Sequence, residues 1–143
     1  MNRMDRIVPE AAQFDLAGQV IGLAMKVHSA LGHGFLESVY QKALAHELRK
    51  TGIRFETEKP IQVRNDGEPV GDFYADFFVE DSLVVELKAV QTIAVAHEVQ
   101  TVNYLKATGI ETGLLLNFGS ERLEFKKKFR TRKTCADQLN GEF

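Results

Sequence analysis

The spacing of apolar residues changes at Gly52, and this change limits the folds open to the chain. Before Gly52, apolar residues recur every three or four positions in two runs, which predicts amphipathic helices over about 16–31 and 36–51. Glycine commonly ends a helix, as expected at Gly52. After Gly52, apolar and polar residues alternate, which is typical of strands. The chain is therefore expected to begin with helices and to continue with a sheet.

Three strands are expected after the helices, at residues 53–63, 72–79 and 83–89. Pro60 interrupts the first of them, so we expect that strand to be bent. A short loop at 80–82 joins the second strand to the third. A further helix and two more strands are expected at 97–108, 112–118 and 123–129.

The order of these elements indicates the fold class. The segment from Ala89 to Thr112 contains a helix and is long enough for a right-handed crossover between parallel strands. Helices, a strand meander, a helix and further strands together favour an α/β (α+β) fold with a central mixed β-sheet flanked by helices. A length of 143 residues fits a single domain over 1–143, with a core at about 15–130 and flexible termini.

The sequence gives no sign of a membrane or an oxidising compartment. Its longest apolar stretches fall far short of the ~20 residues needed to cross a bilayer. Charges and Pro9 occupy the N-terminus where a secretory signal would be apolar, and Cys135 is the only cysteine, so no internal disulfide can form. We expect a cytoplasmic protein with no membrane partner.

Positive charge is concentrated near the C-terminus. The net charge of −2 gives no electrostatic argument for nucleic acid, but residues 126–133 are mostly basic. Lys126 and Lys128 would contact phosphates if this run faced a cleft. The alternative is a solvated edge strand and tail, in which lysines discourage edge pairing. The sequence leaves both interpretations open.

An acidic residue, Glu86, interrupts an otherwise apolar strand. Side chains of a strand alternate, so Glu86 and Lys88 share a face. A three-residue hairpin loop would set Val79 opposite Leu83, and therefore Asp76 opposite Glu86. Like charges directly opposite each other on neighbouring strands are destabilising unless another group compensates them. A two-residue loop would instead put the two acids on opposite faces.

A divalent cation is one possible compensation for the two acids. Mg²⁺ takes oxygen ligands, often one or two carboxylates plus waters and substrate phosphate. Asp76 and Glu86 would supply carboxylate oxygens, and the backbone carbonyl of Leu87 a further ligand. The alternative is an ion-paired surface in which Lys88 offsets both acids. A carboxylate embedded in an apolar run needs a partner and is a functional candidate, which favours the metal site.

Several motifs, in order, resemble those of a known nuclease group. Asp76 followed by Glu86-Leu87-Lys88 resembles the signature of the PD-(D/E)XK, or restriction-endonuclease-like, superfamily. Residues 34–40, Gly-Phe-Leu-Glu-Ser-Val-Tyr, resemble the G-x-x-E-x-x-Y motif that names a family within it. Ala75 stands where the superfamily name implies proline, which carries no metal-binding group. The match extends from Leu16 to about Phe129 and includes Gln100, 103–105 and 113–119.

The resemblance implies a restriction-endonuclease-like α-β-β-β-α-β core and a Mg²⁺- or Mn²⁺-dependent nuclease. Asp76 and Glu86 would hold the metal, and Lys88 would lie near the attacking water. A metal lowers the pKa of bound water and neutralises charge developing on the phosphate, while a lysine stabilises the remaining charge. The expected partner is nucleic acid, with DNA preferred to RNA. Homodimerisation for cleavage of two strands is a further option.

Side chains from the helices are additional candidates. The resemblance implies that Glu37 is a further metal ligand, whereas its spacing alone favours a capping role at a helix N-terminus. It also implies that Gln100 assists Lys88 or contacts substrate, although a structural role fits the spacing equally well. Tyr104 follows Gln100 by one helical turn. Tyr104 and Tyr40 are expected to bind substrate, together with Lys126 and Lys128.

Other functions are less well supported. The four histidines show no zinc-ligand spacing, no G-x-S-x-G or phosphate-cradling glycine motif occurs, and Cys135 lies in no nucleophile signature. Zinc catalysis, hydrolase triads and NTP hydrolysis are therefore not expected. The competing hypothesis is a non-catalytic module that binds nucleic acid or protein with the same fold. Retention of both acids and the lysine argues against it.

Overall fold

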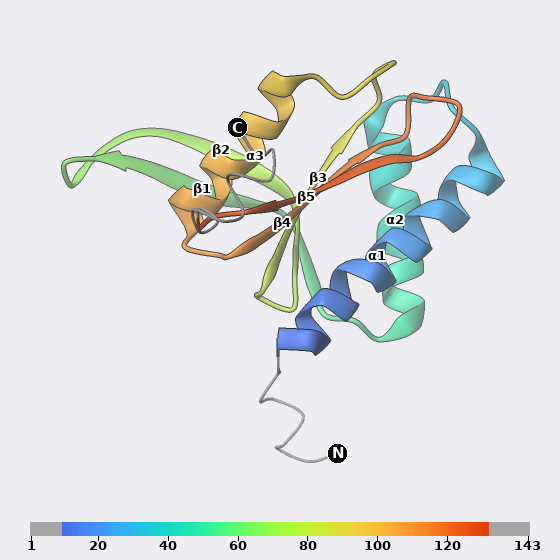
Figure 1. Cartoon of the computed structure of the whole chain (residues 1–143), viewed down its shortest axis with the longest axis horizontal. Helices are drawn as coiled ribbons and strands as arrows, with labels where there is room; N and C mark the ends of the chain where they lie inside the picture. Colours follow the sequence, from blue (N-terminus) through green and yellow to red (C-terminus); the bar gives the residue numbers. More distant parts are fainter. Residues whose placement is uncertain (1–9, 132–143) are drawn as a thin grey trace, which may run out of the picture.

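Residues 10–131 are the part of the chain that the computed structural model describes, with side chains from residue 16 onward. Cys135 and the basic residues after Thr131 lie outside this part. The described elements, in order, are α1 (Glu10–Leu31), α2 (Glu37–Thr51), β1 (Phe55–Asn65), β2 (Glu68–Val79), β3 (Leu83–Lys88), α3 (Val95–Thr108), β4 (Thr112–Asn117) and β5 (Glu124–Phe129) (Figure 1). Each helix and strand expected from the sequence is confirmed, with bounds shifted by a few residues.

The strands form one mixed sheet in the order β1-β2-β3-β4-β5. Within residues 10–131, β3 and β4 are the only parallel neighbours, and α3 is the crossover between them. The other neighbours are antiparallel. The predicted central mixed sheet flanked by helices is therefore confirmed. No helix within residues 10–131 has the length and apolar character required to span a membrane.

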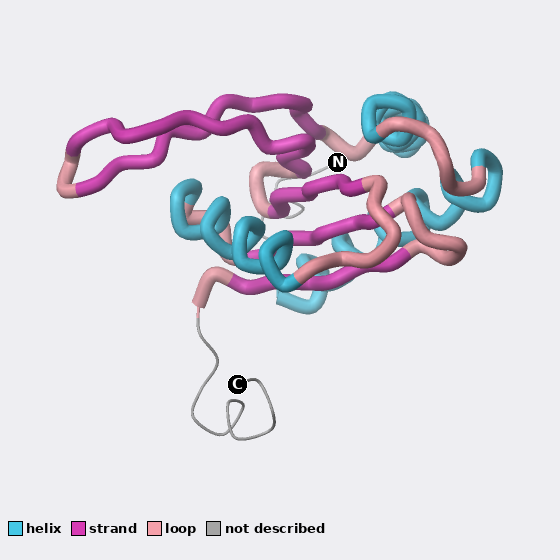
Figure 2. Tube along the Cα trace, turned by 90° about the horizontal axis from the view of Figure 1, so that it is seen from above, coloured by secondary structure: helices cyan, strands magenta, loops and turns pink. Residues whose placement is uncertain are grey.

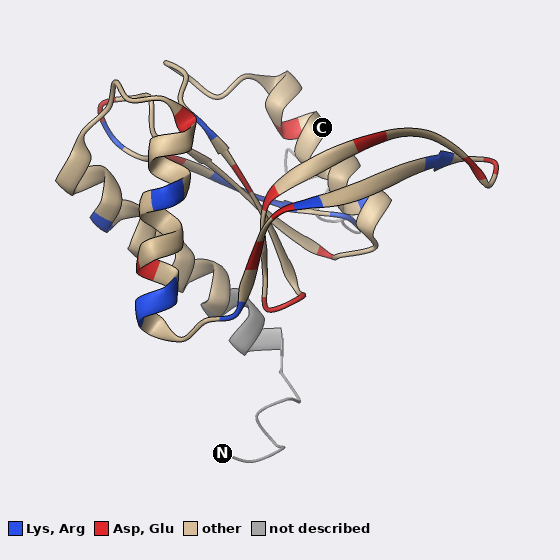
Figure 3. Ribbon diagram, turned by 180° about the vertical axis from the view of Figure 1, so that it is seen from behind, with Lys and Arg blue, Asp and Glu red and all other residues tan. Residues whose placement is uncertain are grey.

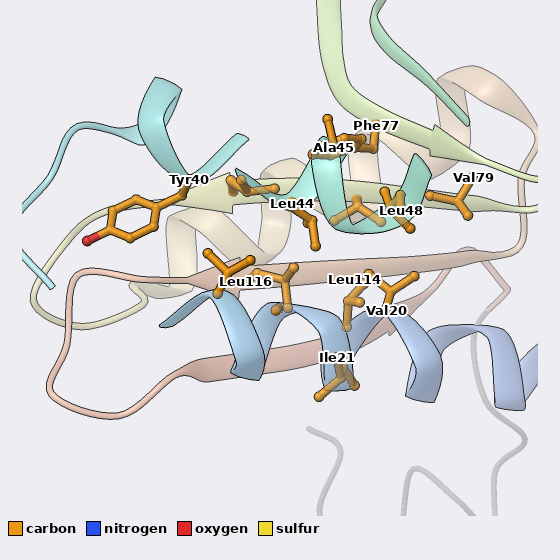
Figure 4. Close-up of a cluster of buried hydrophobic side chains, with 14 of the residues drawn as sticks. Val20, Ile21, Tyr40, Leu44, Ala45, Leu48, Phe77, Val79, Leu114 and Leu116 are labelled. Carbon is orange, nitrogen blue, oxygen red and sulfur yellow. The ribbon is translucent and has the colours of Figure 1, made fainter. Parts of the chain in front are cut away.

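Helices cover both faces of the sheet. α1 and α2 pack on one face, where their apolar stripes meet alternate residues of the inner strands (Figure 4). α3 lies on the opposite face over a smaller cluster (Figure 2). The first cluster includes Val20, Leu44, Leu48, Phe77, Val85 and Leu114, and the second includes Ala75, Phe78, Val84 and Leu105.

Strand β1 runs without interruption through Pro60, and its irregular residue lies two positions earlier, at Glu58. Pro60 pairs with Tyr74, and β1 is the edge strand of the sheet. Proline is tolerated at an edge because its missing N–H can face outward. We call residues 59–75 the β1–β2 arm. The arm extends beyond the other strands and runs alongside α3 (Figures 1 and 2).

Strand β2 changes face at Asp76. Residues two apart in a regular strand share a face, yet Ala75 belongs to the α3-side cluster and Phe77 to the α1–α2 cluster. On β1, Glu58 lies between the partners of these two residues and has a left-handed backbone, with φ of 52°. Both strands are thus irregular at the level of Asp76, where the arm begins.

Candidate active site

Asp76 and Glu86 meet where the β2–β3 ladder ends. The ladder runs from Val79 opposite Leu83 to Phe77 opposite Val85, which confirms the register expected for a three-residue loop. At the next residue of each strand, carboxylate side chains accept the hydrogen bonds that backbone carbonyls accept within the ladder. The N–H of Asp76 donates to Oε2 of Glu86 at 3.1 Å, and the next N–H on β3, that of Leu87, donates to Oδ2 of Asp76 at 2.7 Å.

The two carboxyl groups are mutually unfavourable in their ionised forms. Glu86 is only 6% exposed, and its pKa is raised to about 8, first by burial and then by the charge of Asp76. The pKa of Asp76 is also raised, chiefly by burial, although the Leu87 N–H favours the ionised form. The pair therefore retains a proton at neutral pH. A cation placed between the carboxylates would allow both to ionise.

Lys88 lies beside the pair on the same face of β3. Its Nζ donates to Oε1 of Gln100 on α3 at 3.4 Å. Its charge lowers the pKa of both acids, yet among the ion pairs of the described residues none joins Lys88 to Asp76 or Glu86. The alternative of a surface on which Lys88 is paired with both acids does not describe this arrangement.

Glu37 approaches the pair from the N-terminus of α2. Burial and then the Asp76 charge raise its pKa, while Lys88, the Ala89 N–H and His97 lower it. No side-chain hydrogen bond caps this end of α2, although Glu37 lies in its first turn, where the helix macrodipole favours an acid. In the described part of the chain, however, no three carboxylate, imidazole or thiolate groups converge closely enough to hold one metal ion. Glu37 lies near the pair without completing a three-ligand cluster.

Tyr40, the last residue of the G-x-x-E-x-x-Y motif, lies in the core. Its ring is 0% exposed and stacks on Phe118 with centroids 4.6 Å apart. Its hydroxyl donates to the carbonyl of Gly32 at 2.6 Å and accepts from the N–H of Phe35 at 3.2 Å. A fully buried ring cannot contact substrate, so the expected substrate-binding role of Tyr40 is wrong. Tyr40 fixes the loop that leads to Glu37.

Tyr104 borders the site from α3, one turn after Gln100. Its ring stacks on Phe73 of the arm with centroids 3.7 Å apart. The pKa of Tyr104 is raised by burial and then by the charges of Glu86 and Asp76, which places its hydroxyl within their electrostatic reach. Tyr104 therefore connects the arm to the acidic pair.

The two lysines expected to bind substrate differ in their surroundings. Lys126 is exposed on the edge strand β5, opposite Leu115. Lys128, opposite Gly113, forms an ion pair with Glu98 of α3 at 2.9 Å. The structure thus confirms an edge strand here, and it pairs the Lys128 ammonium with a carboxylate, which weakens the case for phosphate binding by Lys128.

Three supporting residues were not predicted. Gln41 donates from Nε2 to the carbonyl of Asp76 at 3.3 Å, and its position one turn after Glu37 was the available signal. Asn117 is fully buried and accepts from the N–H of Val90 at 2.9 Å, which fastens the chain after β3. A polar residue after an apolar run was the signal there. The charge of Glu58 raises the pKa of Asp76, and no sequence pattern pointed to it.

The loop after β4 is closely packed against the end of β3. Gly119 follows Asn117, and a Cβ atom at Gly119 would lie 2.3 Å from the carbonyl oxygen of Val90. Only glycine fits such an approach. This contact accounts for the glycine that ends the 113–119 motif and holds the segment after Lys88 in place.

Sequence comparison identifies the family to which this arrangement belongs. The model of the PD-(D/E)XK nuclease superfamily matches residues 14–130. The chain belongs to this superfamily. Asp76, Glu86 and Lys88 of this PD-(D/E)XK chain all lie within the matched range. No protein of curated function matches the sequence.

One solved structure shows the same fold at low sequence identity. The crystal structure of SSO0001 is similar with a TM-score of 0.55 and 19% identity, over 67% of this PD-(D/E)XK chain and 50% of that one. An alkaline exonuclease, LHK-Exo from Laribacter hongkongensis, gives a TM-score of 0.44 and 14% identity, over 68% and 55%. The chain thus spans about half the length of these two structures.

Proposed function

We propose that this chain is a nuclease that hydrolyses phosphodiester bonds in DNA, or alternatively RNA, with a water activated by Mg²⁺ or Mn²⁺. The observation that carries the proposal is the Asp76–Glu86 pair, two neighbouring carboxylates at the end of the β2–β3 ladder whose joint ionisation at neutral pH a bound cation would favour. The superfamily match supports the same chemistry.

The donors around the pair suit a hard cation. Mg²⁺ is commonly held by one or two carboxylates, with waters and substrate oxygens completing its shell. Asp76 and Glu86 are the two carboxylates. A strand residue sends its N–H and C=O to the same side, so the carbonyl of Leu87 is directed toward β2, as its N–H is. We propose this carbonyl as a further ligand and Glu37 as a ligand through water.

The remaining residues act on the water and the phosphate. A bound divalent ion would lower the pKa of a water and offset charge on the phosphate. Lys88 carries three N–H donors, and Gln100 accepts from its Nζ, which leaves donors for the attacking water or a phosphate oxygen. Gln100 is thus a positioning residue for Lys88. Lys126 is exposed and would contact the backbone of bound nucleic acid.

A non-catalytic binding module is the second candidate. It is favoured by one observation, that no three ligand side chains converge in the described part of the chain. The retained, partly buried pair argues against it, because a site without a cation has no need for two adjacent acids. The nuclease proposal also includes membership of the G-x-x-E-x-x-Y family, a cytoplasmic location and homodimerisation.

Cleavage assays test the proposal. We expect the full chain to cut at least one form of labelled DNA or RNA with Mg²⁺ or Mn²⁺ and none with EDTA. Asp76→Asn should lower the rate by about 100-fold or more, since loss of a metal ligand removes the activated water. Glu47→Gln, which removes an acid paired with Lys26 at 3.1 Å on the helix surface, is the control. A folded protein with no product and no Mn²⁺ affinity by calorimetry would support the binding module instead.

A further inference from the structure

A pocket of about 630 Å³ separates the β1–β2 arm from α3. The arm contributes Arg64 and Phe73, and α3 contributes Asn103, Tyr104 and Lys106. The stacked rings of Phe73 and Tyr104 form the contact between the two walls, so the pocket begins where the arm touches the helix. Figure 2 shows the arm running beside α3 for much of the length of the helix.

The lining of this pocket contrasts with the acidic pair nearby. Among the described residues that line it, Arg64 and Lys106 are cations and none is a carboxylate. Along the helices and strands, the arm included, acidic and basic residues are interspersed (Figure 3). Cations bind phosphates, an amide such as Asn103 bonds to base edges, and aromatic rings stack on bases. These are the groups found in sites for single-stranded nucleic acid.

The pocket adjoins the candidate active site along α3, because Tyr104 lines the pocket and also borders the acidic pair. Tyr104 is one helical turn, about 5.4 Å, from Gln100, whose Oε1 accepts from Nζ of Lys88 at 3.4 Å. Asn103 lies on the same side of the helix as Gln100, three positions later. A nucleic-acid strand held in the pocket would therefore lie about one helical turn from Gln100, which contacts Lys88.

We propose that this pocket binds a single-stranded segment of DNA or RNA next to the bond that is cleaved, an inference that rests on the proposed nuclease function. Arg64 and Lys106 contact phosphates from the two walls, and the Tyr104 ring sets the position at which the strand enters the active site. The volume is within the roughly 300–1,000 Å³ of sites for small organic groups, which suits individual nucleotides.

Binding measurements with a double variant test this proposal. Fluorescence anisotropy in Ca²⁺, with labelled single-stranded DNA, single-stranded RNA and duplex DNA, compares the wild type with Arg64→Ala/Lys106→Ala. We expect tighter binding of a single strand than of duplex, and an increase in Kd of about tenfold in the variant. The slope of log Kd against log salt should fall by about 1.4, because each phosphate contact contributes about 0.7 on a single strand.

Arg49→Ala/Lys50→Ala is the matched control. It also removes one arginine and one lysine, both exposed, at the end of α2 far from Glu37. This control should change Kd less than twofold, and both double variants should keep the wild-type thermal midpoint. Equal Kd values in the two variants, or tighter binding of duplex than of either single strand, would overturn the pocket assignment. Cleavage by the wild type would still support the nuclease function in that case. The absence of both binding and cleavage would contradict the pocket assignment and the nuclease function together.

Discussion

The backbone N–H of Leu87 donates a hydrogen bond of 2.7 Å to Oδ2 of Asp76, so a carboxylate takes the place of a backbone partner at the end of the β2–β3 ladder. This bond orients Asp76 toward Glu86, whose own carboxylate accepts from the Asp76 N–H. Each acid thus binds the backbone of the opposite strand. The hydrogen bonds that hold the two strands together here also hold the proposed metal ligands in position.

Two substitutions at Asp76 should separate its structural and chemical roles. Asp76→Asn keeps an oxygen that can accept from Leu87, so the metal-free thermal midpoint should stay close to that of the wild type while cleavage is lost. Asp76→Ala leaves the Leu87 N–H without its partner, and an unpaired buried donor costs about 1–3 kcal/mol. Denaturant unfolding in EDTA measures the difference. Equal stability of the two variants would contradict the bridging role of this carboxylate.

The stability of the metal-free protein should fall as pH rises from about 5 to about 8. The pKa of Glu86 is about 8 in the folded protein against 4.5 in the unfolded chain, so between these values the folded state holds the extra proton. Stability then decreases with pH, by at most about 1.4 kcal/mol per unit for one proton. Above about 8 both states are ionised at Glu86 and this dependence ends.

Thermal midpoints measured in EDTA across this range check the pH prediction. Glu86→Gln, which removes the titrating group, should flatten the curve. Saturating Mg²⁺ should flatten it too, because a metal ion replaces the proton between the carboxylates. A wild-type curve as flat as that of Glu86→Gln would show that the proton is not held by Glu86.

Glu37→Gln should abolish metal-dependent cleavage and leave the thermal midpoint nearly unchanged. Glu37 is exposed, and no side-chain bond caps the end of α2 on which it lies. Its expected contribution is therefore to the metal shell, through water, rather than to the helix. Parallel cleavage and thermal unfolding measurements test this. A large loss of stability with retained cleavage would indicate a structural role.

Gln100→Ala should lower kcat by about tenfold with little change in KM, as expected for a group that orients a catalytic residue. Gln100 is exposed and accepts only a 3.4 Å bond from Nζ of Lys88, so its loss should not alter the thermal midpoint. Lys88→Ala should cost about 100-fold or more. Single-turnover kinetics separate the two effects. A Gln100→Ala enzyme with raised KM and unchanged kcat would make Gln100 a substrate contact.

Tyr40→Phe should destabilise the protein while leaving KM unchanged. The substitution removes a hydroxyl that accepts from the Phe35 N–H and donates to the Gly32 carbonyl, and such losses cost about 1–3 kcal/mol. Chemical denaturation gives the stability, and kinetics well below the midpoint give KM. A raised KM at unchanged stability would restore the substrate-binding role that burial contradicts.

Much of the fold could be predicted because helix and strand periods are local. The run ending at Gly52 gave α2, and that glycine has φ of 80° at the helix C-terminus. The three-residue loop after Val79 sets the hairpin register as far as Phe77 opposite Val85, and the two hydrogen bonds beyond it bring Asp76 and Glu86 together. The effect of Pro60 could not be predicted fully, because it depends on whether its strand is an edge strand, and strand order is not a local property.

By itself, the sequence determined which segments are helices and strands, because each depends on residues close together in the chain. It also favoured, without deciding, a hairpin register in which Asp76 faces Glu86. The tertiary structure decided which polar side chains from different elements contact one another. Packing buried Tyr40 against Phe118 and paired Lys128 with Glu98. The change of face at Asp76 carries the β1–β2 arm alongside α3, where it encloses a pocket. These contacts join residues far apart in sequence, so they follow from the packing of whole elements.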